Sequence, residues 1–156
     1  MRLHICATGR LRKGPERDLV DDYLTRFDRT GRGLALGPVE LTEIEDRKGG
    51  GMAAEAALLE RAIPAGAVLC VLDERGTVET SPKFAARLAD WRDGGRTDIA
   101  FVIGGADGLH PDLRARADHA LSFGKMVWPH MLVRVMLAEQ LYRAASILAG
   151  TPYHRD

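Results

Sequence analysis

Short apolar runs alternate along this chain with longer stretches in which apolar residues recur at helical spacing. The strands that these runs predict lie at residues 3–7, 39–44, 67–72, 98–103 and 119–123. The helices are expected to begin at Pro15, Met52, Pro82, Pro111 and Pro129. This alternation predicts one α/β domain over residues 1–156, with a mostly parallel sheet flanked by helices.

Three short segments predict a local structure: a turn, a helix N-cap and a glycine-rich loop. The polar residues 73–76 follow the third strand and are expected to form a turn at its carboxyl end. Ser81 directly precedes Pro82, so a serine N-cap followed by a proline in the first turn is expected for the third helix. The basic, glycine-rich segment 47–51 is either a flexible connector or a flap that touches phosphate. It lacks a Walker-type Gly-Lys-Ser/Thr ending, which favours the connector.

The last predicted helix, residues 129–149, is apolar on more than one side. Its apolar residues are too many to face a single sheet, so the helix needs a second cover. We expect that cover to be another copy of the same chain, in a symmetric homodimer. Glu139 and Arg143 stand four residues apart and are expected to pair on the remaining side.

Glycines close two of the predicted strands. Gly104 and Gly105 follow the fourth strand, and Gly124 follows the fifth. In an open α/β sheet the carboxyl ends of the strands border the crevice where ligands bind, and glycine there lets a ligand approach the main chain. A Rossmann dinucleotide site is not indicated, because no Gly-x-Gly-x-x-Gly follows the first strand. An adenosine-type ligand, held by main-chain groups between apolar walls, fits this pattern.

Composition narrows the function classes without selecting one. The chain has 22 Lys and Arg residues and 22 Asp and Glu residues, a balance that argues against a general affinity for nucleic acid. The first 17 residues are basic, however, and such a local patch can engage phosphates. Cys6 and Cys70 fall in predicted strands and are expected to be small core residues. The sequence has neither metal-ligand spacing nor a run of about 18 apolar residues. We therefore expect no metal, no membrane span and a cytoplasmic protein.

The second half of the chain carries motifs of a known family. They are Ile103-Gly104-Gly105-Ala106-Asp107-Gly108, Leu121-Ser122, Pro129-His130, Arg134-Val135, Glu139-Gln140-Leu141-Tyr142-Arg143-Ala144 and Pro152-Tyr153-His154-Arg155. On these motifs the chain resembles the ribosomal RNA large-subunit methyltransferase H family of the SPOUT class, over nearly its whole length. The resemblance implies methylation of N3 of a pseudouridine in 23S ribosomal RNA, with S-adenosylmethionine as the donor. It also implies a homodimer and a C-terminal trefoil knot, a threading that simple strand and helix patterns would not predict.

The resemblance also assigns the positions that contact the donor. They are Leu72, Gly104, Gly105, Leu121, Ser122, Phe123, Gly124, Lys125 and Met126. The chain departs from the commonest family pattern at Gly124, where serine is frequent, and at Val127, where threonine is frequent. A hydroxyl contact with the donor at either position would therefore be absent here.

Methyl transfer to an imide nitrogen needs a base that loosens the N3 proton and a positive group beside the charge that develops. By residue type, His130 and His154 are candidate bases, and Arg134 or Arg155 could stabilise the charge. Tyr153 is suited to stack on the uracil ring. We expect this C-terminal tail to reach the donor crevice, from its own or from the partner subunit. Structural roles are the alternatives: His130 could cap a helix start, and Arg134 could pair across a dimer seam.

Other functions remain open on the sequence alone. A related SPOUT enzyme would modify transfer RNA, and a non-catalytic α/β dimer would bind a nucleotide as a regulatory ligand. Large-subunit ribosomal RNA is the expected partner, either as naked RNA or within an assembled ribosome. The ribosome is favoured, because a chain without net charge would depend on the shape of the particle for its affinity.

Overall fold

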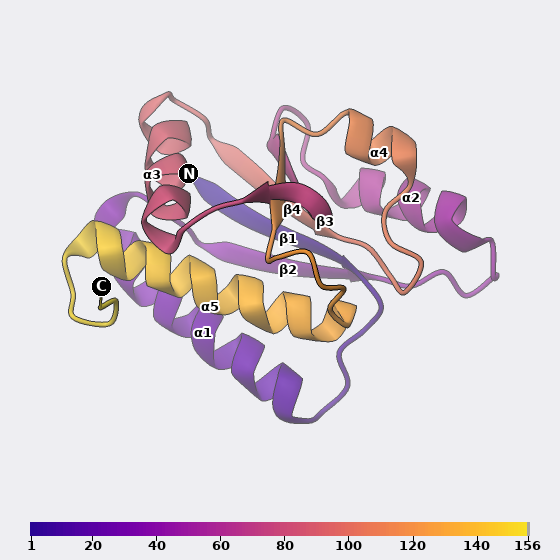
Figure 1. Ribbon diagram of the computed structural model, residues 1–156, viewed down its shortest axis with the longest axis horizontal. Coiled ribbons are helices and arrows are strands. Elements are labelled where there is room, and N and C mark those ends of the chain that lie inside the picture. The colour runs from indigo at the N-terminus through magenta and orange to yellow at the C-terminus, as the bar shows by residue number, and fades with distance from the viewer. Residues whose placement is uncertain (156) are drawn as a thin grey trace.

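The computed structural model of the protein describes residues 1–155. Its five-stranded sheet has the order β2-β1-β4-β3-β5, and every neighbouring pair of strands is parallel (Figure 1). The strands are β1 (Arg2–Thr8), β2 (Val39–Ile44), β3 (Val68–Val78), β4 (Asp98–Ile103) and β5 (His119–Ser122). The helices are α1 (Pro15–Gly31), α2 (Gly51–Ala62), α3 (Ser81–Asp93), α4 (Pro111–Ala115) and α5 (His130–Ala149), with one 3-10 turn, η1 (Arg32–Leu34). The expected α/β architecture is confirmed.

Helices cover both faces of the sheet, because side chains alternate between the two faces along each strand. Along β1, Leu3 and Ile5 pack with residues of α1, α3 and α5, whereas Cys6 packs on the other face with residues of α2 and α4. In Figure 1, α1, α3 and α5 accordingly lie on one side of the strands and α2 and α4 on the other. Because the strands are parallel, their carboxyl ends all lie at one edge of the sheet, between the two helical layers.

The third strand continues where a turn was expected, so that prediction is wrong. β3 pairs with β5 up to Leu72, leaves the register, and pairs again from Thr77 onward. The polar residues 73–76 form an irregularity within the strand instead of ending it. Gly76 permits the return, because a Cβ at this position would lie 2.6 Å from the carbonyl oxygen of Ala120 in β5.

The start of α3 also differs from the prediction. Thr80, not Ser81, is the N-cap: its Oγ1 accepts a hydrogen bond from the backbone N–H of Lys83 at 3.3 Å. Ser81 instead donates from Oγ to Oε1 of Gln140 at 2.8 Å, which joins α3 to α5. Sequence alone could not separate two adjacent hydroxyl residues that both precede a proline.

Helix α5 finds most of its cover within the chain. It packs along α1 and α3, with Leu137, Ala138 and Leu141 buried. Met131 and Leu132, in its first turn, remain exposed. Part of the second cover that we expected from another copy is thus supplied by α1 and α3. No helix within residues 1–155 is long and apolar enough to cross a membrane.

Candidate donor and acceptor site

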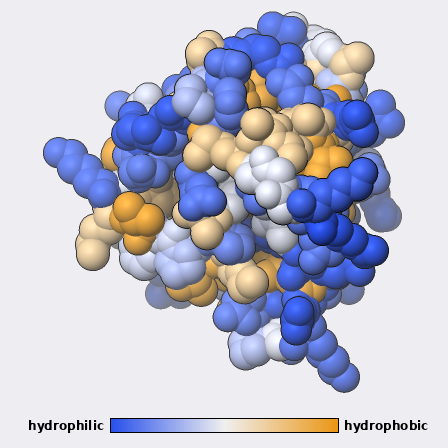
Figure 2. All heavy atoms as spheres, turned by 90° about the vertical axis from the view of Figure 1, so that its right-hand side faces the viewer, coloured by the Kyte–Doolittle hydropathy of each residue, from blue (hydrophilic) through white to orange (hydrophobic). Residues whose placement is uncertain are grey.

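A cleft of about 600 Å³ lies at the carboxyl ends of β4 and β5, beside the irregular segment of β3. It is bordered by the irregular segment of β3, the loop after β4, the loop after β5 and the first turn of α5. Its lining comprises Leu72–Arg75, Ile103–Leu109, Leu121, Phe123, Gly124, Met126–His130 and Val133. Figure 2 faces this side of the molecule and shows hydrophobic surface gathered in the middle, within a hydrophilic rim.

The loop after β4 is a tight turn that presents main-chain groups to the cleft. Gly105 and Gly108 form an isolated bridge, and the N–H of Gly108 donates to the carbonyl oxygen of Gly105 at 3.0 Å. A Cβ at Gly104 would lie 2.7 Å from the carbonyl carbon and oxygen of Gly108. A side chain at position 104 would therefore open this turn.

The loop after β5 supplies the opposite wall, through Phe123, Gly124 and Met126. Ser122 is buried and points away from the cleft. Its hydroxyl accepts a hydrogen bond from the Gly124 N–H at 3.1 Å, and it borders a second hollow of about 450 Å³ between α1, α3 and α5. Lys125 is exposed and does not line the cleft. The cleft thus brings together seven of the nine residues expected to bind the donor, all except Ser122 and Lys125.

Two carboxylates in this cleft were missed when residues 73–76 were interpreted as a turn. Asp73 receives a hydrogen bond from Arg75 Nε at 2.8 Å and lies 3.6 Å from Arg114. Burial alone would raise the pKa of Asp73, but the hydrogen bonds from Arg75 outweigh it and hold that pKa below its ordinary value. Asp73 is therefore ionised, and Glu74 beside it is half exposed. The available signal was a pair of carboxylates directly after a buried strand.

His130 lies at the mouth of the cleft, in the first turn of α5. Its imidazole adjoins the loop after β1, since a Cβ at Gly9 would be 3.5 Å from Nε2 of His130. Burial and the nearby positive charge of Arg134 lower the pKa of His130 below its ordinary value. The ring is therefore neutral at pH 7 and can accept a proton.

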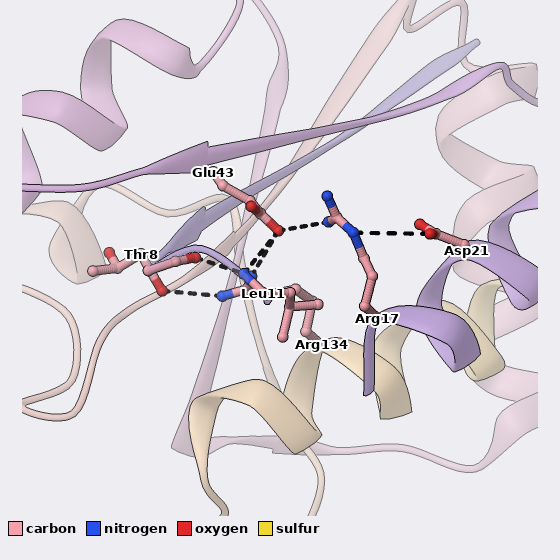
Figure 3. Close-up of polar contacts among 7 residues, drawn as sticks. Thr8, Leu11, Arg17, Asp21, Glu43 and Arg134 are labelled. Carbon is pink, nitrogen blue, oxygen red and sulfur yellow. Dashed lines mark hydrogen bonds and ion pairs between the residues drawn. The ribbon is translucent and has the colours of Figure 1, made fainter. Parts of the chain in front are cut away.

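Arg134 lies inside the core and does not contact the cleft. Its side chain is 0% exposed. Figure 3 shows the guanidinium directed from α5 toward the ends of β1 and β2. It donates to the carbonyl oxygens of Thr8 and Gly9 at 3.0 Å each and pairs with Glu43 at 3.2 Å. The suggestion that Arg134 stabilises charge on the RNA base is thus corrected, because a side chain without exposed surface cannot touch a nucleobase.

The C-terminal tail folds back onto its own α5. The Tyr153 hydroxyl donates to Oε1 of Glu139 at 3.0 Å, and the same carboxylate oxygen accepts from Arg143 at 2.6 Å, so the expected Glu139–Arg143 pair is present. His154 Nδ1 lies 3.2 Å from Nη1 of Arg143. Burial and the Glu139 carboxylate raise the pKa of Tyr153, which stays protonated. Arg155 is exposed.

Within one chain, then, the tail does not line the cleft. His130 lies in the cleft with most of the expected donor-binding residues. Tyr153 and His154 instead contact side chains of α5, and Arg155 is exposed. Any meeting of the tail with the cleft requires a rearrangement or a second copy.

Neither of the two cysteines lines the cleft, and the described residues include no metal-binding cluster. Cys6 and Cys70 are free and buried, as expected, and burial raises the pKa of Cys6 to about 11, so it is a protonated thiol. Among residues 1–155 there is no group of three or more His, Cys, Asp or Glu side chains placed to hold a metal ion.

Comparison with known proteins gives three kinds of match. Residues 1–154 match a family model described as "Predicted SPOUT methyltransferase". The chain is 74% identical over 156 residues to the ribosomal RNA large subunit methyltransferase H of Roseobacter denitrificans, covering 100% of both chains. It is 71% identical over 155 residues to the protein of that name from Ruegeria pomeroyi, covering 99% of both.

Two solved structures share the fold. A probable methylase family protein from Haemophilus influenzae superposes with a TM-score of 0.56 at 12% identity, over 99% of this chain and 70% of the other. A probable methyltransferase from Bordetella pertussis gives a TM-score of 0.52 at 17% identity, over 92% of this chain and 96% of the other.

Proposed function

Since the chain belongs to the SPOUT methyltransferase family, we propose that it methylates large-subunit ribosomal RNA with S-adenosylmethionine as the methyl donor. The target is N3 of a pseudouridine in 23S ribosomal RNA, and the reaction places the protein in the cytoplasm. Full-length identity to relatives named as methyltransferases of large-subunit ribosomal RNA supports that RNA as the substrate. The choice of N3 of a pseudouridine rests on the carboxyl-terminal motif that the chain shares with the family it resembles. Family membership also implies the trefoil knot.

The observation that carries the proposal is the cleft at the ends of β4 and β5, beside the irregular segment of β3. Its residues fit an adenosyl donor. Leu72, Leu121 and Met126 provide apolar contact for a purine ring, and the turn at 104–108 offers main-chain hydrogen-bonding groups. The carboxyl oxygens of Asp73 and Glu74 supply hydrogen-bond acceptors suited to ribose hydroxyls. When bound, S-adenosylmethionine supplies a methyl group on a cationic sulfonium.

The chain's own task is then to orient the acceptor and remove its proton. The imide N3 of a pseudouridine retains its proton at neutral pH, so a base is needed. His130 is neutral, half-buried and at the mouth of the cleft, which makes it the first candidate. His154 is the second, but in this chain its Nδ1 contacts Arg143, away from the cleft.

A homodimer supplies the remaining groups in this proposal. The tail of one chain would lie against the cleft of the other, where Tyr153 stacks on the uracil ring and Arg155 stabilises the charge that develops beside N3. Two features support this arrangement. The tail does not line the cleft of its own chain, and apolar residues beside the cleft, among them Val127 and Leu132, stay exposed in the single chain.

The proposed function is tested with ribosomes from a strain that lacks this protein. Incubation with the purified protein and S-adenosylmethionine should add one methyl group, which mass mapping should locate on a pseudouridine of 23S ribosomal RNA. A methyl group that appears only on transfer RNA would favour the related SPOUT activity instead. A protein that binds neither the donor nor its demethylated product in calorimetry would be the non-catalytic regulator. Purified ribosomal RNA assayed in parallel separates naked RNA from the assembled particle as substrate.

Replacing Arg155 with Ala should lower the methylation rate by about a hundredfold or more, as expected when one charge-stabilising group is lost. Donor affinity measured by calorimetry should be unchanged, since the proposed role of Arg155 is to contact the acceptor base and not the donor. Arg96→Ala, another exposed arginine, is the matched control. Wild-type activity of the Arg155 variant would refute the role of the tail.

A further inference from the structure

The loop between β1 and α1 carries three exposed cations at the edge of the cleft. Arg10, Arg12 and Lys13 are exposed, and within residues 1–155 none of them forms an ion pair or a side-chain hydrogen bond. The loop adjoins His130 through Gly9, and His130 lines the cleft. The proposed chemistry at the cleft does not use these cations.

A buried network holds this loop in place (Figure 3). Arg134 binds the carbonyl oxygens of Thr8 and Gly9, where the loop begins. Oε1 of Glu43 accepts hydrogen bonds from the Leu11 N–H at 3.2 Å, from Arg17 at 2.9 Å and from Arg134 at 3.2 Å. The loop, α1 and α5 thus each donate to one carboxylate of β2, which fixes the middle of the loop.

Leu11 anchors the same loop from within. Its side chain is 4% exposed and packs against Val20 of α1 and Ala138 of α5. Because the neighbours of a buried residue in an extended segment point outward, Arg10 and Arg12 are directed to solvent on either side of this anchor. The backbone of the loop is therefore ordered before any ligand arrives, which lowers the entropic cost of binding.

The charges around the loop determine whether a polyanion would contact the loop side chains or the N-terminus of α1. Arg17 pairs with Glu43 at 2.9 Å and with Asp21 at 3.8 Å. Glu16 and Asp18 stand in the first turn of α1, at the positive end of the helix dipole. The three loop side chains, in contrast, have no acidic partner in the part of the chain that the structure describes. Phosphate groups would thus contact these side chains and not the N-terminus of α1.

We propose that residues 10–13 form the surface that binds the phosphate backbone of the RNA and carries the target nucleotide to His130. This inference rests on the proposed function, since it names where that acceptor is held. It also explains how a chain with 22 basic and 22 acidic residues can engage a polyanion: the positive charge is local and fixed beside the cleft.

The test is the triple variant Arg10→Ser, Arg12→Ser, Lys13→Ser, compared with Arg29→Ser, Arg32→Ser, Arg96→Ser. The control removes three exposed and unpaired cations near the amino ends of the strands. Binding to ribosomes from a strain that lacks this protein is measured over a range of salt concentrations. Each lost phosphate contact reduces the magnitude of the slope of log affinity against log salt by about 0.7 to 0.9. The slope of the loop variant should therefore be smaller by roughly two to three, and the slope of the control should match that of wild type.

Methylation of ribosomes gives a second readout. The loop variant should raise the KM for ribosomes with little change in kcat, because the lost contacts bind ground state and transition state alike. Its affinity for S-adenosylmethionine and its melting temperature should equal those of wild type. A wild-type salt slope in the loop variant, or an equal loss in the control, would overturn the inference. Failure of the wild-type protein to bind the donor would instead count against the proposed function.

Discussion

His130 is the residue on which the proposed chemistry depends most. It is the one candidate base that lines the cleft, and burial beside Arg134 keeps its ring neutral. A neutral imidazole is the form that can accept the N3 proton, so the depressed pKa extends activity to lower pH.

Single-turnover methylation should consequently rise with pH through a pKa below the ordinary histidine value of 6.5 and then level off. The variant His130→Gln keeps a polar side chain but cannot accept this proton. It should lower the plateau rate by about a hundredfold or more and remove the rising limb of the profile. His154→Gln is the comparison, and loss of the limb in that variant alone would assign the base to His154.

The role of Arg134 could not be predicted from its residue type. The sequence identified an arginine near a helix start, and both an RNA contact and a structural role were compatible with it. Its partners, Glu43 and Thr8, lie 91 and 126 residues away in the chain. Only the folded arrangement reveals that the guanidinium is buried among backbone carbonyls. Residue type and position along the chain could not have predicted these distant partners.

At the scale of elements, the glycine turn after β4 is the most sensitive part of the cleft. Gly104→Ala should weaken S-adenosylmethionine binding about tenfold or more, because the added Cβ meets the Gly108 carbonyl group and displaces the turn. Gly33→Ala is the matched control, since a Cβ there meets nothing within 4 Å. Isothermal calorimetry compares the two. Equal affinities would mean that the main chain of this turn does not hold the donor.

The order of strands and helices was predictable because each element carries its own periodicity and its own proline or glycine boundary. β2 and β4 were predicted with the bounds that the structure has. The irregular segment of β3 was not, because residues 73–76 are as polar as a turn, and the strand is recognised as continuous only from the pairing with β5 on either side of them. The same error concealed Asp73 and Glu74 as part of the cleft.

At the scale of the whole molecule, the exposed apolar surface beside the cleft is the basis for the proposed dimer. Met126, Val127 and Leu132 are 74%, 79% and 40% exposed, and a cluster of exposed apolar groups is the kind of surface that the proposed dimer would bury. The sequence suggested a dimer from the number of apolar residues in α5. It could not show that α1 and α3 cover most of that helix and leave its first turn free.

Leu132→Glu should convert the protein into monomers and lower methylation steeply, because a charge in an apolar interface is costly to desolvate. Analytical ultracentrifugation measures the change in mass, and Thr25→Glu, at an exposed position in α1, is the control. A dimer that survives the Leu132 substitution would show that the first turn of α5 is not in the interface.

The central claim is that the cleft holds the methyl donor while a second chain completes the site. A crystal structure of the protein with S-adenosylmethionine bound tests it most directly. The account predicts the donor against Leu72, Gly104 and Leu121, close to His130, with the tail of a partner subunit at the same cleft. A donor bound elsewhere, or a dimer whose tails lie far from both clefts, would contradict it.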